Sequence, residues 1–227
     1  LGRSALRRRL MPAEPAGRVV REELPRWIHP LPGLIERRAA EIRHAERLTP
    51  TVLAVPYCCQ NNSATAHGPR MCFSSSCAMA VEFLRPGSFR ARGQIDDQYL
   101  AIVQRYGEST EASTQLQAIA ACGLTAEFRQ DGTIDDLIAQ LERGIPAPVG
   151  WLHQGPVEEP SGVGHWSVAI GWDPNDRTVL MHDPNGEAGL IGGGYVTTAI
   201  GSGKAQRYSE RNWGRRWMVE GPGSGWW

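Results

Sequence analysis

The sequence lacks the features that mark several large classes of protein. No apolar run approaches the roughly 20 residues that a membrane-spanning helix requires. The arginine-rich beginning has neither the apolar segment nor the small-residue cleavage site of a secretory signal. Net charge is absent as well, because 24 Lys and Arg side chains balance 24 Asp and Glu side chains. We therefore expect a soluble chain with no nucleic-acid partner and no membrane span.

Paired cysteine motifs are also missing. The five cysteines cannot all pair within one chain, and none shows the C-x-x-C spacing of a zinc ribbon. The sequence has neither the H-E-x-x-H pattern of zinc peptidases nor a nucleotide-binding glycine loop. At least one thiol is therefore expected to be free, and no cofactor or metal is expected. The disulfide state of Cys58, Cys59 and Cys77 stays open.

The two ends of the chain differ in composition from its middle. Residues 1–50 are rich in arginine and proline, with one predicted helix from about Leu34 to Leu48, and we interpret them as a basic arm. A solvated extension, a propeptide and a docking segment for a larger assembly remain open for this arm. The sequence begins at Leu1 rather than Met, which favours a fragment or a processed product. The compartment is left open, with secretion and association with a virion among the alternatives.

Residues 201–227 are interpreted as a C-terminal tail rich in glycine and tryptophan, without a predicted helix or strand. Its tryptophans, Trp213, Trp217, Trp226 and Trp227, are expected to pack or to lie at an interface, because large aromatic side chains bury much apolar surface. Docking to a larger assembly through this tail, or contact with a glycan, also stays open.

Between residues 51 and 200, predicted helices precede predicted strands. The three- and four-residue spacing of apolar and small residues after Cys72 predicts a helix up to Leu84. Further helices are predicted over Ile95–Tyr106, Ser113–Cys122 and Ile134–Arg143, the last opened by a capping box of Thr133 and Asp136. Strands are predicted over Ala147–Leu152, His165–Trp172 and Thr178–His182, the last two joined by the turn at residues 173–176. This order predicts an α+β domain with a mostly antiparallel sheet.

Four residues of this domain could carry chemistry. Cys72 begins a helix, whose positive dipole end favours the thiolate form. His165 opens a strand after a glycine-bearing loop, and Asp183 ends the neighbouring strand, roughly across the hairpin from it. An acid there would orient the imidazole and stabilise its charged form. Gln60, twelve residues before Cys72, could help to stabilise an oxyanion, with Asn61 and Asn62 as weaker candidates.

The same residues lie in four motifs that occur in a fixed order. They are residues 55–62 (VPYCCQNN), residues 72–79 (CFSSSCAM), residues 164–172 (GHWSVAIGW) and Asp183-Pro184. This order resembles the bacteriocin-processing (double-glycine) type of papain-like cysteine peptidase, whose pattern is V-P-x-x-x-Q, C-G-P-x-S-x-A-M, G-H-x-V-V-x-G-Y and D-P. The resemblance runs from about Val52 to Asn185.

The resemblance implies a papain-like fold, in which the nucleophile helix packs on the sheet, and it implies a role for each candidate. Cys72 would be the nucleophile and His165 the general base and acid. Asp183 would orient the imidazole, and Gln60 would help to form the oxyanion hole. Phe73 and Ser74 depart from the glycine and proline of the family pattern, which puts the shape and specificity of the pocket in question.

We therefore predict a cysteine endopeptidase that acts on a peptide or protein through an acyl-enzyme. A hydrolase of peptidoglycan peptides that uses the same residues, and an inactive binding module on the same fold, are the alternatives. A zinc hydrolase built from His153, His165, His182 and Asp183 is a further one.

Overall fold

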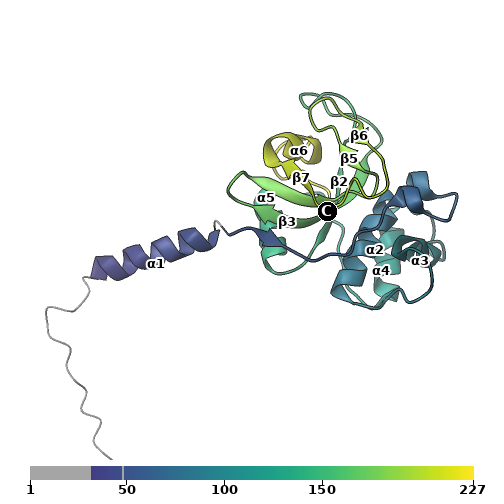
Figure 1. Ribbon diagram of the computed structural model, residues 1–227, viewed down its shortest axis with the longest axis horizontal. Helices are drawn as coiled ribbons and strands as arrows, with labels where there is room; N and C mark the ends of the chain where they lie inside the picture. Colours follow the sequence, from purple (N-terminus) through teal and green to yellow (C-terminus); the bar gives the residue numbers. More distant parts are fainter. Residues whose placement is uncertain (1–31, 48) are drawn as a thin grey trace, which may run out of the picture. The chain divides into compact units, whose positions relative to one another are not determined.

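The computed structural model describes residues 32–47 and 49–227. Most of the predicted arm, residues 1–31, and Leu48 at the end of its predicted helix therefore lie outside the described residues. The chain divides into two units, residues 1–43 and 44–227, and each is described by itself (Figure 1). Among the described residues, no helix is both long and apolar enough to cross a bilayer.

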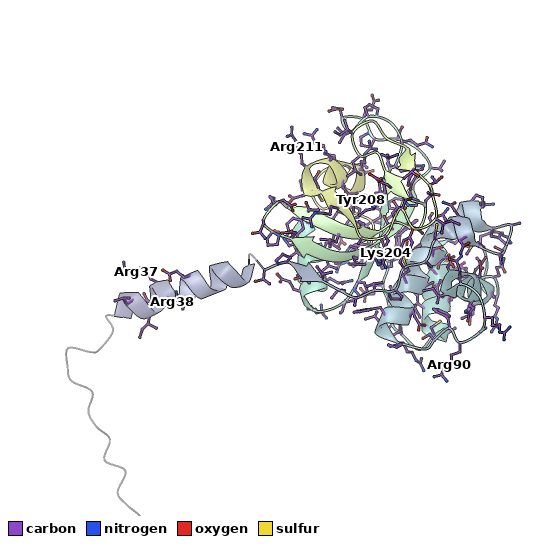
Figure 2. The ribbon with its side chains drawn as sticks, in the orientation of Figure 1. Arg37, Arg38, Arg90, Lys204, Tyr208 and Arg211 are labelled. Atoms are coloured by element: carbon purple, nitrogen blue, oxygen red, sulfur yellow. The ribbon has the colours of Figure 1, made fainter. Side chains whose placement is uncertain are left out.

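Helix α1 (Pro32–Arg47) confirms the helix that the sequence predicts in the arm. Arg37 and Arg38 project from it (Figure 2), and Arg38 forms an exposed ion pair with Glu41 at 3.0 Å. Leu34 and Ile35 are 53% and 60% exposed. The described face of α1 thus presents both charged and apolar side chains.

An antiparallel sheet forms the centre of the second unit. Its strands are β1 (Thr51–Val52), β2 (Ala147–Trp151), β3 (His165–Asp173), β4 (Thr178–His182) and β7 (Gln206–Ser209). The strand order is β1-β3-β4-β7, and β2 also pairs with β3. A smaller sheet pairs β5 (Glu187–Ala188) with β6 (Tyr195–Thr197). The three strands predicted from the sequence are confirmed to within one residue at each end.

The helices before β2 follow the predicted positions closely, whereas the last helix lies in residues 201–227, where the sequence predicts none. They are α2 (Cys72–Leu84), α3 (Ile95–Val103), α4 (Ala112–Ala121), α5 (Ile134–Glu142) and α6 (Glu210–Trp217), with short 3-10 turns η2 (Gln60–Asn62) and η3 (Gly68–Arg70) before α2. The Thr133 and Asp136 capping box is confirmed, because each side chain accepts a hydrogen bond from the other residue's backbone N–H. Helices α2 to α4 precede the main strands and gather on one side of the second unit (Figure 1). The predicted α+β, papain-like arrangement is thus confirmed.

The two faces of the sheet bury alternate residues of β3. Val168 and Ile170 pack with Met79 and Ala80 of α2, whereas Ala169 packs on the opposite face with residues of α5 and α6. This period of two is the one a strand imposes when both its faces are covered. Helix α2 can lie close to the sheet because most of its buried residues are small: Ser74, Ser75, Ser76, Cys77, Ala78 and Ala80.

Residues 201–227 contain elements of this core that the sequence did not predict. Strand β7 pairs with β4, and Trp213 and Trp217 of α6 are 0% and 2% exposed in the cluster beneath the sheet. The expectation that these two tryptophans pack is confirmed. Beyond α6, Gly225 and Trp226 form isolated bridges to Gly132 and Gly150.

Candidate active site

Cys72 is the first residue of α2, as the sequence predicts. Among the described residues, no side chain caps this helix end, and its first turn contains no acidic residue. The first backbone N–H groups of a helix lack intrahelical partners and carry the positive end of the dipole. Because this helix end is uncapped, its positive potential can stabilise a negative charge on the Cys72 sulfur. Cys72 is partly exposed, whereas the other four cysteines are buried.

His165 and Asp183 meet in the interior. The Nε2 atom of His165 lies 2.8 Å from Oδ1 of Asp183, and the two side chains are 5% and 0% exposed. The register of the hairpin pairs Val168 with His182, so Asp183 follows the last paired residue of β4. Asp183 is thus a diagonal neighbour of His165 rather than its direct partner, and diagonal side chains on a sheet remain within reach.

The carboxylate of Asp183 is held by two further donors. The hydroxyl of Tyr208 donates to Oδ2 at 3.0 Å, and the backbone N–H of Asn185 donates to Oδ1 at 2.9 Å. Tyr208 lies on β7, 25 residues beyond Asp183, and it is 2% exposed. The sequence reasoning missed Tyr208 because no motif connects it to the site, and only the pairing of β7 with β4 brings it there.

The hydrogen bond through Nε2 leaves the other nitrogen of the His165 ring available, and the interaction of His165 with Cys72 shifts the pKa of both groups. Burial lowers the pKa of His165, but the charge of Asp183 and the contact with Cys72 outweigh it and raise that pKa to about 10. Burial raises the pKa of the Cys72 thiol, but the interaction with His165 and the nearby backbone of Trp166 and Phe73 lower it below the ordinary value. The arrangement therefore favours a thiolate and imidazolium pair near neutral pH.

Aromatic rings enclose the imidazole. Trp151, His153 and Tyr195 each contact the His165 ring edge to face, with centroids 5.4, 5.7 and 5.7 Å away. Burial and the charge of His165 lower the pKa of His153, so His153 is the neutral partner of the two. These rings exclude water from one side of His165, which strengthens its interaction with Asp183.

Gln60 lies in η2, in the segment that leads to α2, and is 3% exposed. Its Nε2 donates to the carbonyl of Gly68 at 3.0 Å, which holds the amide while leaving a second N–H for another acceptor. Asn61, a weaker candidate, instead donates to the backbone and side chain of Asn185. Asn62 is exposed.

One of the four candidate ligands of a zinc hydrolase, His182, is engaged elsewhere. His182 is occupied on both ring nitrogens, since Nε2 contacts the Val55 carbonyl at 3.0 Å and Nδ1 accepts from the Ala205 N–H at 3.0 Å. Within residues 32–47 and 49–227, no group of three or more His, Cys, Asp or Glu side chains is arranged to hold a metal ion. All five cysteines are free, so Cys58, Cys59 and Cys77 form no disulfide in this structure.

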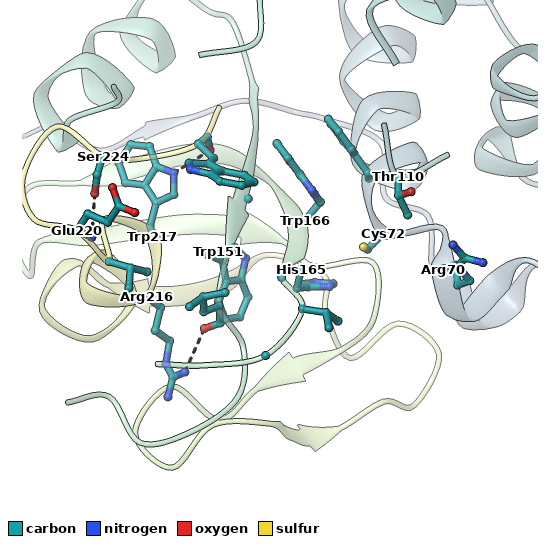
Figure 3. A pocket seen from close by; sticks show the side chains of 18 of the residues that line it. Arg70, Cys72, Thr110, Trp151, His165, Trp166, Arg216, Trp217, Glu220 and Ser224 are labelled. Carbon is teal, nitrogen blue, oxygen red and sulfur yellow. Dashed lines mark hydrogen bonds between the residues drawn. The ribbon is translucent and has the colours of Figure 1, made fainter. Parts of the chain in front are cut away.

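A cavity of about 690 Å³ opens at the candidate dyad. Figure 3 shows Cys72 and His165 at its wall, with Arg70 on one side and Glu220 and Ser224 on the other. Tryptophan side chains supply much of the remaining lining: Trp151, Trp166, Trp217 and Trp226. The site therefore combines a thiol of lowered pKa with a cavity of the size that ligand sites commonly have.

Phe73 and Trp166, the residues that follow Cys72 and His165, stack on each other. Their ring centroids are 3.6 Å apart and the planes differ by 2°. The stack joins α2 to β3, and both residues line the cavity. Phe73, the departure from the family pattern, thus has a packing partner of its own, and it leaves the contact between Cys72 and His165 in place.

Comparisons with known proteins identify the family of this chain. A search of curated proteins finds no match. A crystal structure from Bacillus anthracis that is described as a C39-like peptidase matches with a TM-score of 0.45 and 14% identity, over 74% of this chain and 93% of its own. The model of the Peptidase_C39 like family matches residues 52–192, which include Gln60, Cys72, His165 and Asp183. The chain belongs to this C39-like family of cysteine peptidases.

Proposed function

We propose that this protein is a cysteine endopeptidase with Cys72 as nucleophile. The observation that carries the proposal is the buried His165 and Asp183 pair, whose histidine lines the same cavity as the partly exposed Cys72 (Figure 3). A thiolate with its imidazolium already formed can attack a carbonyl without a separate deprotonation step.

The reaction then follows from the positions of the groups. The Cys72 sulfur bonds to the substrate carbonyl carbon, and His165 gives its proton to the leaving amine as the C–N bond breaks. Water next attacks the thioester carbon while His165 takes its proton, and the S–C bond breaks to release the acid and restore the thiolate. Asp183 keeps the imidazole oriented and stabilises its charge in both steps.

Gln60 is proposed to supply one donor for the oxyanion, together with the backbone N–H of Cys72. The support is that its amide is buried and held by Gly68, with one N–H remaining. A donor that is fixed before the reaction stabilises the transition state without the cost of reorganisation.

The test compares hydrolysis of casein and of purified peptidoglycan by the parent, Cys72→Ala and Cys122→Ala. Release of new amino groups from casein that is lost only in Cys72→Ala supports the proposal. Cys122 is the matched thiol control because it is 8% exposed and lies in the helical cluster of α2, α3 and α4. Release from peptidoglycan alone would instead favour the wall hydrolase, and release from neither would favour a binding module.

A further inference from the structure

The cavity at Cys72 is built from two parts of the chain that lie far apart in sequence. One part comes from α2, β2, β3 and the loop before β3, and the other comes from the C-terminal segment. We define the C-terminal wall as Val219, Glu220, Ser224 and Trp226, which all line the cavity. These residues lie beyond residues 52–192, the range that the family model matches. The C-terminal wall is thus a feature of this chain that the family match does not describe.

Backbone hydrogen bonds hold the C-terminal wall in place. The carbonyl of Trp226 accepts from the Gly150 N–H and from the indole of Trp217, both at 2.9 Å. Gly225 exchanges two hydrogen bonds with Gly132, and Trp227 exchanges two with Arg129. Residues 225–227 are therefore fixed against β2 at Gly150 and against the segment that contains Arg129 and Gly132 by isolated bridges and backbone hydrogen bonds.

A buried arginine fixes the start of the same segment. The Arg216 guanidinium donates to four backbone carbonyls, those of Leu152, Gln154, Gly155 and Leu190. These acceptors lie in the loops that flank β2 and β5. Hydrogen bonds therefore fix the C-terminal residues at both ends, at Arg216 and at residues 225–227. The C-terminal wall is thus a fixed surface of the cavity.

Glycines allow the tryptophans to approach the backbone closely. A Cβ atom at Gly150 would lie 2.9 Å from the Trp166 ring, and one at Gly132 would lie 2.9 Å from the Trp217 ring. A Cβ at Gly225 would also collide with Trp217. The indole rings therefore lie directly over glycine backbone. A residue with a side chain at these positions would push the rings away, so the glycines permit the aromatic lining of the cavity.

The lining near the dyad suits a large apolar group. Trp226 is 48% exposed, and Phe128 lies between it and Trp166, with ring centroids 6.1 Å from each. Val163, on the loop before His165, is 99% exposed and also lines the cavity. Exposed aromatic and aliphatic surface of this kind becomes buried when an apolar side chain fills the space, which favours binding.

We propose that the C-terminal wall makes this cavity a subsite for a large apolar side chain, aromatic above all, of a peptide substrate. This inference rests on the proposed peptidase function and specifies its substrate class. A substrate with only glycine around the cleaved bond would leave the aromatic surface exposed to water. The C-terminal wall therefore selects against such a substrate.

The test uses two thiol-directed probes, the chloromethyl ketones of N-acetyl-phenylalanine and of N-acetyl-glycine. In each, a bond forms between the Cys72 sulfur and the methylene carbon, and chloride leaves. The second-order rates are measured by intact-protein mass spectrometry. We expect the phenylalanine probe to react at least about tenfold faster, the ratio that burial of one aromatic side chain supports. We expect Trp226→Ala to bring the ratio of the two rates close to one.

Two further variants serve as controls. Trp226→Phe should keep most of the preference, and Tyr106→Ala should keep all of it, because Tyr106 is 43% exposed but does not line the cavity. Far-ultraviolet circular dichroism establishes that each variant is folded. A parent that reacts equally fast with both probes, or a preference unchanged in folded Trp226→Ala, overturns the inference.

A separate experiment distinguishes failure of the proposed peptidase function from failure of the subsite. If Cys72 reacts with neither probe, the proposed nucleophile fails, and the subsite is then tested by calorimetric binding of N-acetyl-phenylalaninamide and N-acetyl-glycinamide to Cys72→Ala. Preference for the phenylalanine compound that Trp226→Ala removes still supports the subsite. Equal or undetectable binding of both compounds rejects it.

Discussion

The Nε2 atom of His165 lies 2.8 Å from Oδ1 of Asp183, and this contact is almost completely buried. Burial alone would lower the pKa of His165, yet the carboxylate and the Cys72 sulfur raise it to about 10. The histidine is therefore expected to carry its proton throughout the neutral range. Its charge then stabilises the Cys72 thiolate, whose pKa is lowered in turn.

Asp183→Asn should reduce kcat by about 100- to 10,000-fold, because the amide keeps the size of the side chain but removes its charge. Burial would then dominate and lower the pKa of His165. The imidazolium would be lost at a lower pH, so the alkaline limb of the pH profile of kcat/KM should move down. An alkaline limb in the same place as that of the parent would contradict the role of Asp183.

Tyr208→Phe tests whether the second oxygen of Asp183 matters. Loss of the 3.0 Å hydrogen bond leaves more negative charge facing His165, so the alkaline limb of kcat/KM should move to higher pH. Stability should fall by about 1–2 kcal/mol in urea unfolding, because the Ala188 N–H also loses its acceptor.

Tyr57→Phe is the matched control, since its hydroxyl contacts the backbone carbonyl of Asp183 at 3.1 Å and not the carboxylate. It should leave the alkaline limb unchanged. Equal pH profiles for the two tyrosine variants would show that Tyr208 acts only through packing.

Gln60→Ala should lower kcat by about 100- to 1,000-fold with a small change in KM, as expected when a donor to the oxyanion is removed. Asn61→Ala is the control, because the Asn61 amide is engaged with Asn185 and lies at an exposed position. The two variants are compared in steady-state kinetics on one peptide substrate. A loss in Asn61→Ala that matches the loss in Gln60→Ala would remove the case for Gln60.

Trp213→Ala should destabilise the protein by about 3–5 kcal/mol, since Trp213 is completely buried beneath the sheet. Arg211→Ala on the same helix should change stability by less than about 0.5 kcal/mol, because Arg211 is exposed (Figure 2). Urea denaturation monitored by fluorescence and circular dichroism measures both. A Trp213→Ala variant as stable as the parent would mean that α6 is dispensable for the core.

The elements that the sequence predicts well are those with a strong local pattern. The helix after Cys72, the capping box at Thr133 and the hairpin that brings Asp183 near His165 all depend on neighbouring residues. The hairpin pattern in the sequence predicts that these two side chains lie close together, but it does not predict the bulge between Ala169 and Gly171.

The parts that the sequence did not reveal depend on distant pairings. Tyr208 reaches Asp183 only because β7 pairs with β4 in the sheet. Trp226 is held at the cavity by the hydrogen bond from the Gly150 N–H to its carbonyl. The many glycines between them, such as Gly192–Gly194, obscure any local period. The stacking of Phe73 on Trp166 likewise joins residues 93 positions apart, a relationship that single-sequence patterns cannot supply.

The most direct test of the central proposal is the rate at which iodoacetamide alkylates Cys72 as a function of pH, in the parent and in His165→Ala. We expect that at pH 6 the parent thiol reacts faster than a model thiol, because its pKa is lowered by His165. His165→Ala should remove this advantage and move the titration to higher pH. A parent thiol no faster than the model thiol at pH 6, with no loss in His165→Ala, would contradict the central proposal.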